Sequence, residues 1–144
     1  MQSMRVLHVE DDFADAMLLQ HALCDAGAYD FDLEVVRTLR DARLKLARRR
    51  YDLIIADLRL PDSVNPNATV ALIEKHAAGA PILVLTGSAG VDAEKMGSKV
   101  KVLDKNAFFH NRDDRKSRAL LQQVRETVES ENEDGEDGDD ALIL

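Results

Sequence analysis

Short apolar runs alternate with amphipathic stretches along most of the chain. The apolar runs are "RVLHV" (5–9), "LEVV" (33–36), "DLIIAD" (52–57), "PILVLT" (81–86) and "VKVLD" (100–104). Runs of this length between polar residues are typical of buried β-strands. In the intervening stretches and after the last run, apolar residues recur at helical spacing. This spacing predicts helices over about 14–26, 39–50, 66–78, 90–97 and 113–130.

Two of these helices have terminal signals in the sequence. Gly27 follows the helix predicted over 14–26, at a position where glycine commonly ends a helix. Pro66 can occupy the first position of the helix over 66–78, with Asn65 as its N-cap.

The order of elements is a strand followed by a helix, repeated five times. Continuous apolar strands separated by helices predict a parallel sheet covered on both faces. Five units of this size favour an α/β fold of the flavodoxin-like doubly wound type, with strand order 2-1-3-4-5. In that order the first and third strands are neighbours, and ligands bind at the carboxyl ends of the strands near this switch point.

Acidic charge is concentrated at the C-terminal end of the chain. Residues 131–144 contain seven acids and no Lys or Arg, whereas residues 1–130 carry 20 acids against 19 basic residues. We therefore predict a nearly neutral folded domain over 1–130 and an acidic, disordered segment over 131–144. The final "ALIL" is either a loose end or a segment that docks on a partner or on the body of the protein.

Composition also limits the classes of function. The net charge of −8 argues against nonspecific nucleic-acid binding. No apolar run approaches the roughly 20 residues of a membrane span, and acids appear too early for a signal peptide. Cys24 is the only cysteine, so an internal disulfide is impossible. These features predict a cytoplasmic protein that binds neither nucleic acid nor a membrane.

Polar residues follow or end four of the five predicted strands. They are Glu10, Asp11 and Asp12 for the first strand, Asp57 for the third, Thr86 for the fourth and Lys105 for the fifth. In the predicted strand order they all lie on one edge of the sheet. A group of carboxylates there is a hard-oxygen site for Mg²⁺, and an Asp beside that ion can attack a phosphoryl group. The metal, a lysine and a hydroxyl would then stabilise the phosphoryl oxygens.

Each of these residues also has an ordinary structural interpretation. Asp57 lies eight or nine residues before the next helix, too far for a helix cap. Asp12 is either the N-cap of the helix over 14–26 or a bystander. Thr86 alone would be a polar strand end, and Lys105 alone a surface lysine. Their joint placement at four strand ends is what indicates a site.

Four segments of the chain together resemble a known family. "VLHVEDD", "YDLIIADLRLPD", "PILVLTG" and "VLDK" are similar to the signatures of response-regulator receiver domains of two-component signalling. The resemblance covers about residues 4–130. It implies that Asp57 accepts a phosphoryl group. It also implies that Glu10 and Asp11 belong to a Mg²⁺ site, with Asp11 as the more direct ligand and Glu10 acting through water.

The resemblance assigns three further residues. It implies that the backbone carbonyl of Arg59 ligates the metal, that Thr86 supplies the switch hydroxyl and that Lys105 pairs with the phosphoryl group. Receivers accept phosphate from the phosphohistidine of a histidine kinase or a phosphotransfer protein. Since no second folded domain is expected after residue 130, we predict a stand-alone receiver. It would act on a downstream protein partner or as a phosphorelay shuttle, and not as an enzyme.

The sequence departs from the family pattern near the fifth strand. Asn106 stands where a proline commonly follows the lysine, so we expect a trans peptide bond there. Val102 stands where an aromatic side chain often moves with the switch threonine. The interval from Thr86 to Lys105 also looks short. We therefore expect an atypical readout on this side of the domain.

Three other functions compete with the leading hypothesis. The first is a receiver-like module that binds its partner regardless of phosphorylation. The second is a Mg²⁺-dependent phosphohydrolase of the haloacid-dehalogenase kind, in which the nucleophile follows the first strand and a second Asp stands two residues later. Here Asp57 follows the third strand, and Arg59 stands two residues after it. The third is a flavin binder, but the acids of "EDDFADA" would repel a flavin phosphate.

Overall fold

The computed structural model of the chain describes residues 2–26, 29–63, 65–86, 100–104 and 118–129. Within these residues, five strands form one parallel sheet in the order β2-β1-β3-β4-β5. The predicted flavodoxin-like doubly wound fold with strand order 2-1-3-4-5 is therefore confirmed. No helix in the described part of the chain is long and apolar enough to cross a membrane.

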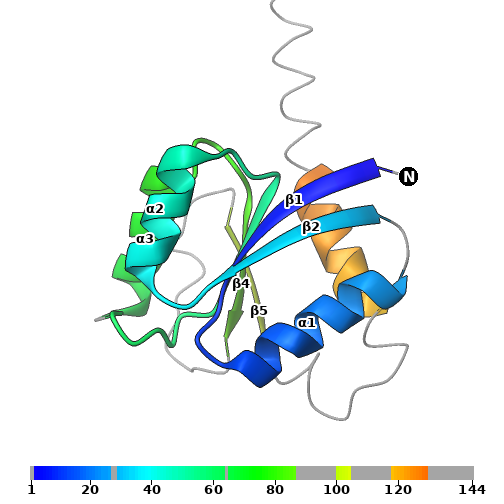
Figure 1. Ribbon diagram of the computed structural model, residues 1–144, viewed down its shortest axis with the longest axis horizontal. Coiled ribbons are helices and arrows are strands. Elements are labelled where there is room, and N and C mark those ends of the chain that lie inside the picture. The colour runs from blue at the N-terminus through cyan, green and yellow to red at the C-terminus, as the bar shows by residue number, and fades with distance from the viewer. Residues whose placement is uncertain (1, 27–28, 64, 87–99, 105–117, 130–144) are drawn as a thin grey trace, which may run out of the picture.

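The elements follow one another as predicted (Figure 1). The strands are β1 (Gln2–Val9), β2 (Tyr29–Val36), β3 (Leu53–Ala56), β4 (Ile82–Thr86) and β5 (Val100–Asp104). The labelled helices are α1 (Phe13–Ala26), α2 (Leu39–Arg48) and α3 (Pro66–His76). Residues 118–129 are also helical. The helix predicted over 90–97, the start of the one predicted over 113–130 and the acidic segment lie outside the described residues.

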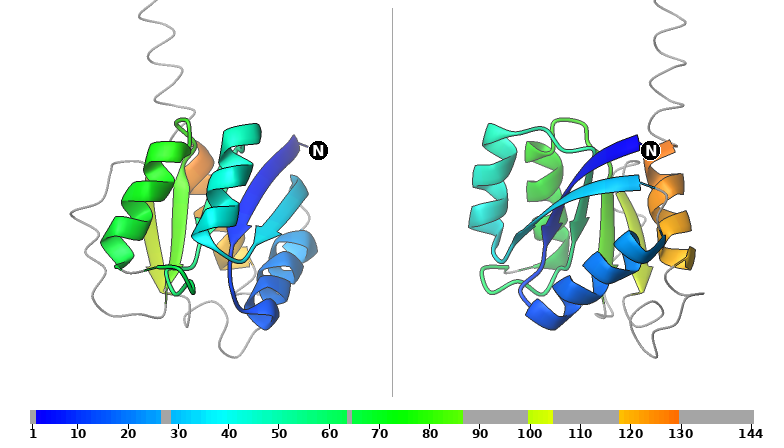
Figure 2. Two further views of the ribbon diagram at one scale, coloured as in Figure 1. Left: turned by 60° about the vertical axis from the view of Figure 1, so that its left-hand side comes forward. Right: turned by 45° about the vertical axis from the view of Figure 1, so that its right-hand side comes forward.

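The sheet separates two hydrophobic cores (Figure 2). On one face, α2 and α3 pack against side chains such as Leu7 and Ile54. On the other face, α1 and the helical residues 118–129 pack against side chains such as Val6 and Ile55. Successive strand residues point to opposite faces, so a strand covered on both sides must be apolar throughout. All of β3 and β4 is buried accordingly.

The first two strands are longer than predicted. They pair in continuous register from Gln2 with Tyr29 to Val9 with Val36, although we predicted strands over only 5–9 and 33–36. The pairing of β1 with β3 is shorter and involves only Val6 to Val9. The first half of the β1–β2 pair therefore extends past the rest of the sheet. Polar residues are tolerated there, and they masked the strand signal in the sequence.

Two helices end earlier than predicted. α2 ends at Arg48 rather than at residue 50, because its C-cap Arg49 has extended backbone angles, φ −139° and ψ 154°. α3 ends at His76 rather than at residue 78. The chain turns out of this helix through Ala78 and Gly79, whose φ angles are positive at 54° and 87°. A left-handed residue after the last turn is a common way to end a helix.

Candidate functional site

Asp57 lies directly after β3, at the carboxyl edge of the sheet. Its backbone N–H donates to the Val9 carbonyl oxygen at 2.9 Å, which continues the β1–β3 pairing past the last residue of β3. Its Oδ1 accepts a hydrogen bond of 3.0 Å from the backbone N–H of Arg59. The residue is only 5% exposed. The fold therefore places a buried carboxylate at the switch point between β1 and β3.

Glu10 occupies the corresponding position after β1. It is 2% exposed, and its backbone N–H donates to the Val36 carbonyl oxygen at 2.8 Å. Because Val9 pairs with Ala56, Glu10 and Asp57 follow at neighbouring positions on strands that lie about 4.8 Å apart. Two buried carboxylates at such neighbouring positions would repel each other if both are ionised, and a cation between them would relieve that repulsion.

Asp12 is the N-cap of α1. Its Oδ1 accepts a hydrogen bond of 3.1 Å from the backbone N–H of Asp15, and its carbonyl oxygen accepts one of 3.0 Å from the N–H of Ala16. A side-chain oxygen that satisfies a free N–H of the first turn is the defining contact of an N-cap. The alternative left open by the sequence, cap or bystander, is thereby decided.

Asp11 contacts a basic residue from the loop after β2. Its carboxylate Oδ1 lies 3.7 Å from Nη2 of Arg37, and the same nitrogen donates to the Asp11 carbonyl oxygen at 3.4 Å. Both side chains are well exposed. Nothing in the sequence pointed to Arg37, because it lies 26 residues from Asp11.

The expected cluster of three carboxylates is not formed in this conformation. Within the described ranges, no three acidic, histidine or cysteine side chains are grouped so as to hold a metal ion. The Asp11 carboxylate lies next to Arg37 instead. The donor chemistry still suits Mg²⁺, which is commonly held by only one or two carboxylates together with waters. Glu10 and Asp57 would supply such a pair, and metal ligation by these two residues, by Asp11 and by Arg59 stays a prediction.

Thr86 is the last residue of β4 and is 6% exposed. The register places it opposite Asp104, the last residue of β5. The predicted site residue Lys105 and its neighbour Asn106 lie outside the described residues. Val102 is partly buried in β5, where it packs against the core under α2 and α3.

Asp62 connects the loop after Asp57 to the start of α2. Its two carboxylate oxygens accept hydrogen bonds of 2.9 Å and 3.1 Å from the backbone N–H groups of Leu39 and Arg40. Desolvation raises the pKa of Asp62 although the residue is exposed, but these backbone hydrogen bonds outweigh it and hold the pKa below its ordinary value. Sequence reasoning missed this contact, because its partners lie 22 and 23 residues away.

Comparison with known proteins assigns the family. The model of the response regulator receiver domain matches residues 6–108, and the chain therefore belongs to the response regulator receiver domain family. Its relatives include the swarming motility regulation protein RssB of Serratia marcescens, 38% identical over 106 residues, which are 72% of this chain and 43% of that protein. The regulatory protein LuxO of Vibrio cholerae is 37% identical over 84 residues, which are 58% of this chain and 18% of LuxO. The chain thus spans less than half the length of these relatives.

Solved structures show the same fold. A CheY-like receiver domain protein from Methanospirillum hungatei has a TM-score of 0.72 at 19% identity, covering 92% of this chain and 99% of its own. The response regulator TrrA of Thermotoga maritima, solved in complex with Mg²⁺ and BeF, has a TM-score of 0.66 at 20% identity, covering 88% of this chain and 99% of its own. Receiver domains in general bind Mg²⁺ at the phosphorylation site.

Proposed function

We propose that this chain is a response regulator receiver that accepts a phosphoryl group on Asp57 in a Mg²⁺-dependent reaction. The observation that carries the proposal is the Asp57 carboxylate, 5% exposed, at the carboxyl end of β3 beside the buried Glu10. Membership of the receiver family supports the same assignment. The phosphoryl donor would be the phosphohistidine of a histidine kinase or of a phosphotransfer protein.

In the proposed reaction, an oxygen of the Asp57 carboxylate attacks the phosphorus atom of the phosphohistidine. A P–O bond forms as the P–N bond breaks, and the electron pair leaves on the imidazole nitrogen, which then takes up a proton. Glu10, Asp11, Asp57 and the Arg59 carbonyl would hold Mg²⁺, which would neutralise charge on the carboxylates and the phosphoryl oxygens when bound.

Two further residues would contact the product. The hydroxyl of Thr86 and the ammonium group of Lys105 would bind phosphoryl oxygens through charge-assisted hydrogen bonds. Thr86 would thereby bias a two-state element that a downstream protein partner reads, unless the chain passes its phosphoryl group on as a relay. We propose that the chain acts in the cytoplasm and that it does not turn over an external substrate.

Phosphotransfer profiling against the histidine kinases of the same genome tests this function. Each kinase is labelled with radioactive ATP and mixed with the chain in the presence of Mg²⁺. We expect rapid transfer from one kinase, or very few, to the wild-type chain and to Asp62→Asn, and none to Asp57→Ala. Asp62→Asn is the matched control, since Asp62 lies in the same loop as Asp57. Equal labelling of Asp57→Ala, or no transfer from any kinase, would contradict the proposal.

A further inference from the structure

The segment around α2 carries a local excess of positive charge. Residues 37–50 contain seven basic residues and one acid, a net charge of +6. The other residues of 1–130 contain 12 basic residues and 19 acids, a net charge of −7. A net positive charge is therefore concentrated on one helix and its flanks, although the domain as a whole is nearly neutral.

The exposed face of α2 combines this charge with an apolar side chain. Arg40, Arg43, Leu44, Ala47 and Arg48 are all exposed, and at 100° per residue they form one continuous arc of the helix. Leu44 lies one turn from Arg40 and from Arg48. It is 49% exposed, among the most exposed large hydrophobic side chains described. The α2 surface, as we call these five residues, is thus basic around an apolar centre.

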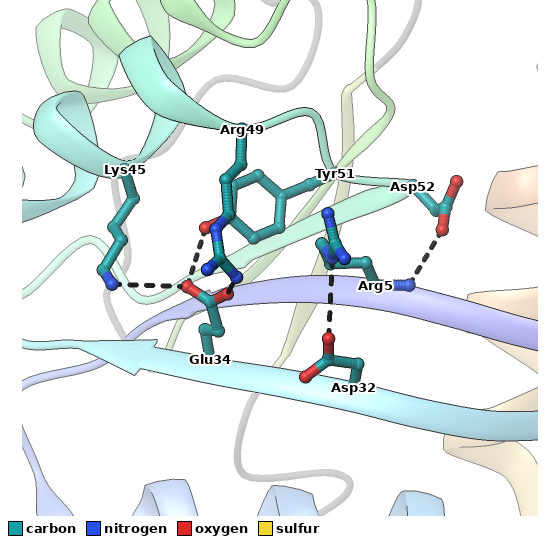
Figure 3. A network of polar contacts seen from close by, with 7 residues as sticks. All are labelled: Arg5, Asp32, Glu34, Lys45, Arg49, Tyr51 and Asp52. Carbon is teal, nitrogen blue, oxygen red and sulfur yellow. Dashed lines mark hydrogen bonds and ion pairs between the residues drawn. The ribbon is translucent and has the colours of Figure 1, made fainter.

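The arginines of this surface are not neutralised by the rest of the domain. The neighbouring bases Lys45 and Arg49 both pair with Glu34 of β2 (Figure 3). By contrast, no carboxylate of the described residues lies within ion-pair distance of the side chains of Arg40, Arg43 or Arg48. Three cationic groups therefore remain available to a ligand of opposite charge.

The acidic segment of this same chain has the matching chemistry. Residues 131–140 contain seven carboxylates and no basic residue, and the apolar "ALIL" follows directly at 141–144. Carboxylates suit the guanidinium groups, since each arginine can bind one through two parallel hydrogen bonds. The apolar residues that follow suit Leu44. The acidic segment therefore matches the α2 surface both in charge and in its apolar part.

The chain is long enough to bring the two together. The helical residues 118–129 and α2 lie on opposite faces of the sheet, and both end at the edge where β1 begins (Figure 2). The 15 residues 130–144 span roughly 50–54 Å when extended, well over the ~30 Å diameter of a small domain, so that one part can cross the edge while the rest binds. The acidic segment can therefore pass around this edge and reach the α2 surface.

We propose that residues 131–144 dock on the α2 surface of the same chain, with their carboxylates on Arg40, Arg43 and Arg48 and their apolar end at Leu44. Individual exposed ion pairs are weak, but tethering gives the segment a high effective concentration at this surface. Nucleic acid is the less suitable ligand, because a chain of net charge −8 repels it. The bound segment would shield the α2 surface from other acidic partners.

Paramagnetic broadening in the full-length chain tests this docking. Cys24→Ser removes the native thiol, and Gly138→Cys places one spin label within the acidic segment without removing a charge. We expect the label to cause a greater loss of amide signal along α2 than along α1 or α3. Rising salt should reduce that loss, because it screens exposed charges. Broadening spread equally over the three helices, or none, would overturn the proposal.

A pair of charge variants makes the test specific. Arg43→Glu reverses one charge of the α2 surface, whereas Lys75→Glu makes the same change on the exposed surface of α3. We expect the first variant to lose the selective broadening and the second to keep it, with both showing the amide shifts of a folded α2. Equal behaviour of the two variants would contradict the proposal.

A mixed sample separates docking within one chain from docking between chains. Isotope-labelled chains without a spin label are combined with spin-labelled chains without isotope. We expect no selective loss of α2 signals in this mixture. If the mixture shows the same loss as the doubly labelled chain, the segment binds a second copy and the proposed docking within one chain is wrong.

Discussion

Tyr51 and Glu34 show how single residues join the helix layer to the edge of the sheet. The Tyr51 hydroxyl donates a hydrogen bond of 2.8 Å to Oε2 of Glu34, which also pairs with Lys45 and Arg49 (Figure 3). Burial, together with the hydrogen bond to Glu34 and its charge, raises the pKa of Tyr51 to about 12. The hydrogen bond from Tyr51 lowers the pKa of Glu34 against the effect of burial, and the two basic neighbours add to this.

These shifts predict where stability depends on pH. The pKa of Tyr51 is raised in the folded state, so its contribution to the free energy of unfolding is complete below the ordinary tyrosine pKa near 10. It is lost as the pH rises through about 12. Glu34 has a lowered pKa, so its contribution is complete above the ordinary value of 4.5 and is lost as the pH falls below it.

The ultraviolet absorbance of tyrosinate measures the alkaline part of this prediction. The chain has two tyrosines and no tryptophan, so Tyr29→Phe leaves the signal of Tyr51 alone. We expect Tyr51 to ionise near pH 12 while circular dichroism shows a folded protein, and near pH 10 in urea. Ionisation near pH 10 in the folded chain would contradict the assigned hydrogen bond. Tyr51→Phe should remove the transition.

At the scale of elements, the N–H groups of the first four residues of α2 all have acceptors. Those of Leu39 and Arg40 donate to Asp62. That of Asp41 donates to the Thr38 hydroxyl oxygen at 3.0 Å, and that of Ala42 to the Thr38 carbonyl oxygen. The N–H groups at the start of a helix usually find acceptors on residues next to them in sequence. Here half of the acceptors come from the loop that carries the proposed phosphorylation site.

Removal of Asp62 should loosen the start of α2. We expect Asp62→Ala to speed hydrogen exchange at the N–H groups of Leu39 and Arg40, while exchange at Asp41 changes less because Thr38 still caps it. Asp62→Asn keeps one acceptor oxygen, so its hydrogen-exchange rates should lie between those of the wild type and of Asp62→Ala. Since the pKa of Asp62 is lowered, its contribution should also be lost as the pH falls below the ordinary value of 3.8. Unchanged exchange in Asp62→Ala would show that the contact has no energetic weight.

The part of the site carried by strand ends was predictable, and the part carried by loops was not. Glu10, Asp57 and Thr86 follow directly from the strand order, because parallel strands bring their carboxyl ends to one edge. Asp62 and Arg37 act on residues more than 20 positions away. Their partners depend on how two loops fold, and local sequence patterns do not encode this. The pairing of Asp11 with Arg37, in place of a three-carboxylate cluster, has the same origin.

At the scale of the whole molecule, the helical residues 118–129 complete the second core. Leu120, Leu121 and Val124 are buried in it together with Leu19 and Leu23 of α1. This helix is therefore part of the folded unit, although the family match ends at residue 108. The predicted domain boundary near residue 130 depends on this packing.

Truncation of one core residue measures this contribution. Leu120 is 1% exposed, and we expect Leu120→Ala to lower the free energy of unfolding by about 2–5 kcal/mol. Gln122→Ala on the exposed side of the same helix should change it by less than about 0.5 kcal/mol. Urea denaturation of both variants checks the expectation. If both variants change the free energy of unfolding by a similar small amount, residues 118–129 do not belong to the cooperative unit.

The central claim is that Asp57 is the phosphorylation site of a Mg²⁺-dependent receiver. The most direct measurement is the intact mass of the chain after incubation with a small-molecule phosphodonor, with Mg²⁺ or with a chelator, for the wild type and for Asp57→Asn. We predict the addition of one phosphoryl group to the wild type with Mg²⁺ and almost none in the other three samples. Equal labelling of Asp57→Asn, or labelling of the wild type that does not depend on Mg²⁺, would contradict the claim.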